Sequence, residues 1–193
     1  MRPIRLIAGI ATAAAVIVGV TACSGSMPGN GGASGSRAVL YSNLDALEAD
    51  SAIVVSGETV RLSTDVSDTG LPITYVTLRV DEVFEPSSLG ENLPADLLAE
   101  ADRVDVGVGD QILVKQYGSA DAPGEFPPLT ERSRYLLFLV PTMQEGEDAS
   151  TFYVVGANAG IYAADNDAFS RAYPDSGDSL PMTLTTADLG GAR

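Results

Sequence analysis

Aliphatic and polar residues alternate through the middle of the chain. From Val76 to Val80, aliphatic residues occupy every second position and polar residues lie between them. This period of two is typical of a β-strand with one buried face. The next aliphatic residue, Val83, lies three positions after Val80 and breaks the alternation. We therefore expect one strand over residues 73–84, with a β-bulge near Glu82 that restores the phase.

Two further segments show the pattern of half-buried strands. Residues 52–62 are rich in β-branched residues around Gly57, where we expect a bulge or a bend. Residues 111–117 alternate, so that Lys115 and Tyr117 share the face opposite Ile112 and Val114. Both segments have the length and composition of ordinary strands.

The second half of the chain adds more apolar segments. Residues 135–140 form an unbroken apolar run that is too short to span a membrane, so both faces of this strand should be buried. Residues 151–155 and 160–163 are also strand-like. The turn residues 156–158 between them, Gly-Ala-Asn, predict a hairpin.

Helical patterns are short and few. Asn43 precedes a segment, residues 44–49, with apolar residues at three-residue spacing, and its side chain can cap that helix. Residues 94–101 predict a second helix with Pro94 in its first turn. Residues 104–110 fit an edge strand or a loop, and residues 176–193 have no clear pattern. About six strands with two or three short helices indicate a mainly β fold, a small closed or partly open barrel or a sandwich.

The first two dozen residues differ from the rest. Arg2 and Arg5 precede the uncharged run 6–20, and the small residues Thr21 and Ala22 follow it, as in a secretory signal. Val-Thr-Ala-Cys at 20–23 resembles the lipobox of bacterial lipoproteins. The resemblance implies cleavage before Cys23, a diacylglycerol on its sulfur and, usually, an acyl chain on the new amino group. The alternatives are a retained membrane helix and an ordinary signal peptide with an unmodified thiol.

These patterns divide the chain into three parts. Residues 1–22 are the expected signal peptide, and Cys23 is the expected lipidation site. Residues 23–38, rich in Gly and Ser, cannot bury enough apolar surface to fold, so we expect a flexible tether. Residues 39–193 are expected to form one β-rich extracytoplasmic domain. The expected location is the outer side of the cell membrane, where two lipid chains anchor a protein stably.

The charge is strongly negative. The whole chain has a formal net charge of −15, and loss of Arg2 and Arg5 with the signal peptide would leave nine basic against 26 acidic residues. Such a surface repels phosphates, so we exclude nucleic acid as a partner. It also disfavours flat binding to an anionic membrane. The acidity serves either solubility or the binding of cations.

The residue inventory excludes several kinds of catalytic site. There is no His, and Cys23 is the sole cysteine. A Ser-His-Asp triad, a Cys-His pair and zinc sites built on His or Cys are therefore excluded. A base near a serine could only be Lys115, the one lysine; the other interpretation is a lysine that blunts a strand edge.

Other candidates are less specific. The acidic loops 164–167 and 175–178 offer oxygen ligands for Ca²⁺ or are solvated turns. Aromatic residues supply either the core or an exposed binding patch. They are Tyr75, Phe84, Tyr117, Tyr135, Tyr153 and Tyr162. We assign no catalytic, cofactor or metal residue from these patterns.

The order of four strand segments along the chain is a second feature that can be compared with known domains. The segments are Ser-Ala-Ile-Val-Val-Ser-Gly-Glu-Thr-Val at 51–60, Val-Asp-Glu-Val-Phe-Glu at 80–85, Gly-Asp-Gln-Ile-Leu-Val at 109–114 and Arg-Tyr-Leu-Leu-Phe-Leu at 134–139. This pattern resembles netrin-like and metalloproteinase-inhibitor domains, which implies an OB-like barrel over about residues 51–163. It is also similar to small secreted domains of Gram-positive bacteria. The inhibitors use a free N-terminal cysteine and disulfides, which this chain lacks, so inhibition is not carried over.

Taken together, the sequence predicts a lipid-anchored, extracytoplasmic, monomeric binding module that is not an enzyme and needs no cofactor. The expected ligand is a protein or a glycan of the cell envelope. The alternative is a carboxylate-dependent hydrolase of envelope polymers. An enzyme would require convergent carboxylates of raised pKa in a concave pocket, whereas a binding module requires only an exposed patch or groove.

Overall fold

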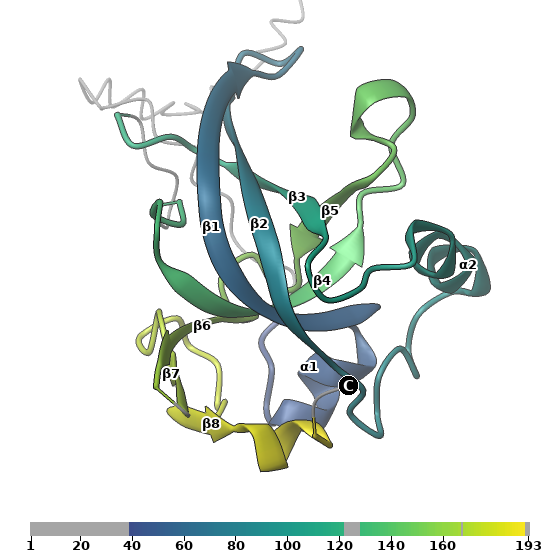
Figure 1. Cartoon of the computed structure of the whole chain (residues 1–193), viewed down its shortest axis with the longest axis vertical. Helices are drawn as coiled ribbons and strands as arrows, with labels where there is room; N and C mark the ends of the chain where they lie inside the picture. Colours follow the sequence, from purple (N-terminus) through teal and green to yellow (C-terminus); the bar gives the residue numbers. More distant parts are fainter. Residues whose placement is uncertain (1–38, 122–127, 167, 192–193) are drawn as a thin grey trace, which may run out of the picture.

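Five strands close into a ring in the computed structural model, which describes residues 39–121, 128–166 and 168–191 (Figure 1). In order around the ring they are β1 (Ile53–Val66), β2 (Pro72–Phe84), β3 (Gln111–Tyr117), β5 (Thr151–Val154) and β4 (Arg134–Pro141). β4 pairs back with β1, and all neighbours are antiparallel except β3 and β5. The mainly β, partly closed barrel expected from the sequence is confirmed.

A second layer lies below the barrel in Figure 1 and extends the sheet from β4. Its strands are β6 (Ile161–Asp165), β7 (Ala168–Arg171) and β8 (Thr183–Thr185), which lie near α1 (Leu44–Ala49) and η2 (Thr186–Leu189). β4 therefore borders two apolar clusters. Leu137 and Leu139 belong to the barrel cluster, whereas Leu136 and Phe138 belong to the cluster that includes Leu47 of α1. These four side chains are fully buried, so the prediction of two buried faces is confirmed for residues 136–139, whereas Tyr135 and Val140 are half-buried.

The register of β1 and β2 confirms the bulge expected near Glu82. Ser56 pairs with Glu82, but the next residue, Gly57, pairs with Val80, so Asp81 is the extra residue. The aliphatic residues on both sides of the bulge reach the core, with exposures of 1% and 8%. The sequence breaks its alternation where the backbone takes up this extra residue.

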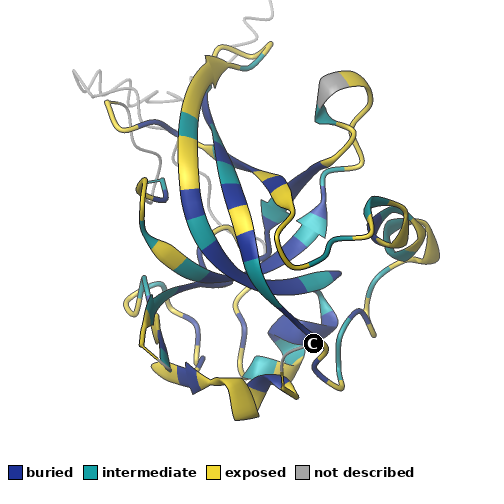
Figure 2. Cartoon of the chain, in the orientation of Figure 1, coloured by how far each residue is buried: buried dark blue, intermediate teal, exposed yellow. Residues whose placement is uncertain are grey.

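Gly57 lies at the same irregularity, as its position in the sequence predicted. A Cβ at this position would lie 2.2 Å from the carbonyl oxygen of Arg79, well inside van der Waals contact. A second register shift follows between Thr59 and Arg61. β1 curves strongly around the barrel, and Figure 2 shows it buried along its lower half and exposed toward the hairpin at its upper end.

The two predicted helices are present. The Asn43 side chain accepts a hydrogen bond from the backbone N–H of Ala46 at 2.8 Å and caps α1 as expected. α2 (Ala95–Val104) begins directly after Pro94 and lies on the outside of the barrel. Residues 105–110 form a loop and not an edge strand. A 3₁₀ turn, η1 (Gly146–Asp148), lies in the loop between β4 and β5.

The predicted hairpin between residues 151–155 and 160–163 is wrong. β5 pairs with residues 139–141 of β4, and β6 pairs with residues 135–137, so the two strands follow one another along one edge of β4. The chain between them leaves β4 after Val155, whose N–H donates to Phe138 O at 2.9 Å. It returns at Gly160, whose carbonyl oxygen accepts from the Phe138 N–H at 3.0 Å. Gly160 is required because a Cβ there would lie 2.9 Å from Cβ of Phe138.

The weakly patterned end of the chain holds β8 and η2, which the sequence did not reveal. The expected signal peptide, the tether and Cys23 lie outside the described residues. Within residues 39–121, 128–166 and 168–191, no helix has the length and apolar character that crossing a membrane requires.

Candidate functional site

Three tyrosines gather on the outer surface of β2, β3 and β5. Tyr75 of β2 pairs with Lys115 of β3, and Lys115 pairs with Tyr153 of β5. Paired residues project to the same side of a sheet, and the alternate positions of these strands fill the barrel core. Tyr117 follows Lys115 at the next outward position of β3. We call Tyr75, Lys115, Tyr117 and Tyr153 the tyrosine face.

Lys115 fixes the β4–β5 loop against this face. Its side chain is 6% exposed, and its Nζ lies 2.7 Å from Oδ2 of Asp148 and 2.8 Å from Oε1 of Gln144. The hydroxyl of Tyr75 donates to the same Asp148 oxygen at 3.3 Å, and Nζ lies 5.5 Å from the centroid of the Tyr75 ring. The edge-lysine interpretation is wrong because β3 is paired on both sides. The Lys115 ammonium donates hydrogen bonds to a carboxylate and to an amide, which does not support the interpretation as a base beside a serine.

The protonation states of this cluster follow from burial and from the ion pair. Burial lowers the pKa of Lys115, but the hydrogen bond to Asp148 and the nearby tyrosines raise it, and the net shift is upward. Burial, and then the hydrogen bond to Asp148, raise the pKa of Tyr75. Burial, followed by the neighbouring Tyr117 phenol, raises the pKa of Tyr153 to about 12. At neutral pH the Tyr75 and Tyr153 phenols are therefore uncharged, and the protonated Lys115 lies against Asp148.

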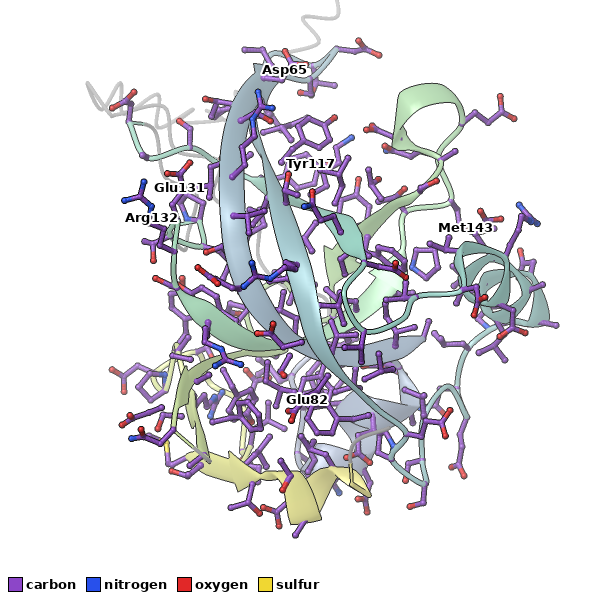
Figure 3. All side chains as sticks on the ribbon, viewed as in Figure 1. Asp65, Glu82, Tyr117, Glu131, Arg132 and Met143 are labelled. Atoms are coloured by element: carbon purple, nitrogen blue, oxygen red, sulfur yellow. The ribbon has the colours of Figure 1, made fainter. Side chains whose placement is uncertain are left out.

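The exposed part of the face is a stacked pair of rings. Tyr117 is 51% exposed and stacks on Tyr153, with ring centroids 6.2 Å apart and planes inclined by 17°. Gln144 Nε2 donates to the Tyr153 hydroxyl at 3.3 Å, which holds the inner ring. Leu113, 37% exposed, precedes Lys115 on the same side of β3. Figure 3 shows Tyr117 in the upper half of the molecule.

The other aromatic residues singled out by the sequence lie elsewhere. Phe84 and Tyr162 are fully buried in the cluster below the barrel. Tyr135 lies on β4, and its hydroxyl is 3.0 Å from Thr130 Oγ1. The aromatic residues singled out by the sequence therefore divide between core and surface, and those at the surface patch are Tyr75, Tyr117 and Tyr153.

A separate hollow of about 330 Å³ lies between the barrel and the β6–β7 hairpin. It is lined by Ser56, Gly57, Glu82, Arg134, Ala164, Asn166, Phe169 and Thr186. Ser56 is 4% exposed, and its hydroxyl donates to Glu82 Oε2 at 3.2 Å. Arg134 Nη2 lies 2.9 Å from Asp81 Oδ2. We call this the bulge hollow, because the bulge at Asp81 brings Glu82 opposite Ser56.

Among the described residues, Glu82 is the one acidic side chain that lines this hollow. A second hollow, about 320 Å³ beside the β1–β2 hairpin, has Asp65 and Asp121 in its lining. Burial and then Asp45 raise the pKa of the Glu48 carboxyl of α1 to about 7, and this residue lines neither hollow.

The acidic loops do not assemble a metal site in the described structure. Asp178 forms an almost fully buried ion pair with Arg171 at 3.0 Å and accepts a hydrogen bond from the Tyr41 N–H. Asp165 accepts from the Asn166 side chain, and Asp167 lies outside the described residues. No group of three or more acidic or cysteine side chains that could hold a metal ion lies together in residues 39–121, 128–166 and 168–191.

The sequence did not point to the residues that complete the tyrosine face. Asp148 and Gln144 lie 33 and 29 residues from Lys115, in a polar loop with no motif. Glu82 differs, since the break in alternation marked its position. No family model matches the chain, and no curated protein has a significantly similar sequence.

Proposed function

We propose that this chain is a lipid-anchored binding module of the bacterial cell envelope that holds a neutral glycan against its tyrosine face. The observation that carries the proposal is the half-exposed Tyr117 ring, which stacks on Tyr153. The Tyr153 ring is in turn held by its hydrogen bond from Gln144 in the absence of a ligand. Aromatic faces pack against the C–H faces of sugar rings, and phenol and amide groups hydrogen-bond sugar hydroxyls. A preformed surface binds without the entropic cost of ordering it.

Charge narrows the ligand class. Anionic polymers are disfavoured because the chain has 26 acidic residues against 11 basic ones. A cationic ligand is disfavoured because the Lys115 ammonium already lies over the Tyr75 ring and is paired with Asp148. With anionic and cationic ligands disfavoured, an uncharged ligand rich in hydroxyl groups fits the tyrosine face best.

A protein partner is less well matched than a glycan. A stable protein interface buries about 800 Å² on each partner. The tyrosine face offers two stacked rings and Leu113, which suit one or two sugar rings better than a protein surface. A non-catalytic role fits the position of Glu48, since this carboxyl of raised pKa lines neither hollow.

Anchoring is the second part of the proposal and rests on Cys23. Two chains on one sulfur would hold a monomeric domain at the outer face of the membrane. In Cys23→Ser, we expect no fatty-acid labelling and an uncleaved precursor, measured by metabolic labelling and intact mass. Ser24→Ala is the matched control and should be labelled and cleaved normally. Full labelling of Cys23→Ser would contradict the anchor.

The glycan site is tested with the full chain on immobilised neutral oligosaccharides of N-acetylglucosamine, mannose and galactose. Tyr117→Ala should weaken the affinity for the glycan at least tenfold, which corresponds to about 1.4 kcal/mol of binding free energy. Tyr117→Phe should keep most of the affinity because it keeps the ring. Met182→Ala, which truncates an exposed residue beside β8, is the control. Capture of a protein in place of any glycan, or equal binding by Tyr117→Ala, would overturn the proposal.

A further inference from the structure

The lining of the bulge hollow combines two opposite charges with an apolar wall. Glu82 and Arg134 bring opposite charges to one cavity from two strands of the barrel. Phe169 and Ala164, from the β6–β7 hairpin, add an apolar wall. The hollow is about 330 Å³, at the small end of the roughly 300–1,000 Å³ that small-molecule pockets span.

Glu82 is aimed by the backbone. The extra residue, Asp81, shifts the register so that Glu82 lies opposite Ser56. Ser56 is nearly buried, and its hydroxyl binds one carboxylate oxygen of Glu82. Bulges often re-aim a side chain beside a functional site. The bulge therefore turns an acidic side chain toward the cavity lining instead of the core, whose places are taken by the flanking aliphatic residues.

Arg134 is held in a complementary way. Its Nη2 binds Asp81, the extra residue of the same bulge, at 2.9 Å. A guanidinium has five N–H donors, so this contact leaves others for an anion. Asp81 itself does not line the hollow. One bulge thus supplies the acidic lining residue and the residue that positions the basic one.

We propose that the bulge hollow binds a small zwitterion of the α-amino-acid class. Glu82 and Ser56 take the ammonium end, Arg134 takes the carboxylate, and Phe169 packs against a small aliphatic side chain. The site is distinct from the tyrosine face, since Figure 3 places Glu82 in the lower half and Tyr117 in the upper half of the same view.

The first test needs no variant. Alanine is titrated into the full chain and followed by NMR or calorimetry, together with ethylamine and propionate, which each keep one of its two charges. We expect alanine to bind at least tenfold more tightly than either analogue, with valine and leucine showing how large a side chain fits. Equal affinity for alanine, ethylamine and propionate, or no binding by alanine, would overturn the proposal.

The second test locates the site. Glu82→Gln and Arg134→Gln should each lower the affinity for alanine at least tenfold. Glu100→Gln is the matched control, because Glu100 lies on α2, forms an ion pair with Arg103 and does not line the hollow. Thermal melting confirms that each variant is folded. Unchanged alanine binding by Glu82→Gln, or equal losses in Glu82→Gln and Glu100→Gln, would contradict the assignment.

Discussion

The two outer surfaces of the barrel are built in different ways. The tyrosine face is built on a stacked ring pair, and its ion pair is largely buried, with side-chain exposures of 6% for Lys115 and 23% for Asp148. The bulge hollow is concave, and its ion pair is open to water, with exposures of 60% for Arg134 and 25% for Asp81. Side-chain packing and a buried charge thus hold one surface, while an irregularity of the backbone shapes the other.

This difference predicts which changes each surface tolerates. A buried charge left without its partner is costly, whereas an exposed ion pair contributes little. The tyrosine face should therefore be sensitive to loss of charge. The bulge hollow should be sensitive to added volume at Gly57 and almost indifferent, in stability, to loss of Arg134.

The largest expected effect is at Asp148. Asp148→Ala leaves the Lys115 ammonium buried with neutral hydrogen-bond partners such as the Gln144 amide and no carboxylate, so it should lower the free energy of unfolding by about 3 kcal/mol. Arg134→Gln, the matched change in the exposed pair, should cost less than about 1 kcal/mol. Urea denaturation measures both. Similar losses in the two variants would mean that the surfaces are not held differently.

The second effect is at Gly57. Gly57→Ala places a Cβ about where the Arg79 carbonyl lies, so β1 and β2 must separate at the bulge. We expect a loss of roughly 2–3 kcal/mol in the free energy of unfolding, typical of overpacking. Ser63→Ala, at an exposed position of the same strand, should change it by less than about 0.5 kcal/mol. A Gly57→Ala variant as stable as Ser63→Ala would contradict the tight bulge.

The third effect concerns Glu48, which belongs to neither surface and reports on the fold as a whole. Its pKa is about 7 in the folded protein against 4.5 for the free group, so the folded state holds the proton more tightly. The stability from this group is fully present below pH 4.5 and is lost as pH rises through 7. Wild type should lose roughly 2 kcal/mol more than Glu48→Gln between pH 5 and pH 8.

Urea midpoints of the two proteins at both pH values test this directly. Parallel pH dependence in wild type and Glu48→Gln would show that Glu48 titrates normally. The pKa of Lys115 is shifted upward, so its ammonium stays charged at both pH 5 and pH 8. Asp148→Ala should therefore lower the free energy of unfolding by the same amount at the two pH values.

Much of the barrel was predictable because its strands are long and their alternation is local. The bulge near Glu82, the Asn43 cap and the doubly buried strand at 135–140 all follow from spacing within a dozen residues. β7 and β8 are only four and three residues long, and their pairing depends on β6, so no local pattern marks them. The β5–β6 error has the same origin, since the turn residues cannot show that both strands share one edge of β4.

The candidate sites were less predictable than the fold. Tyr117 and Lys115 were assigned to one face of a strand from alternation alone, and this is confirmed. Their partner Asp148 lies 33 residues beyond Lys115, and only folding brings the two together. The opposite charges of the bulge hollow likewise come from β2 and β4, which do not pair with each other.

The proposed role is tested most directly by the affinity of the full chain for neutral oligosaccharides before and after removal of a single ring. If the tyrosine face is the ligand site, Tyr117→Ala loses at least tenfold in affinity while Tyr117→Phe and Met182→Ala bind like wild type. If Tyr117→Ala binds as tightly as wild type, or wild type binds none of these oligosaccharides, the tyrosine face is not a glycan site.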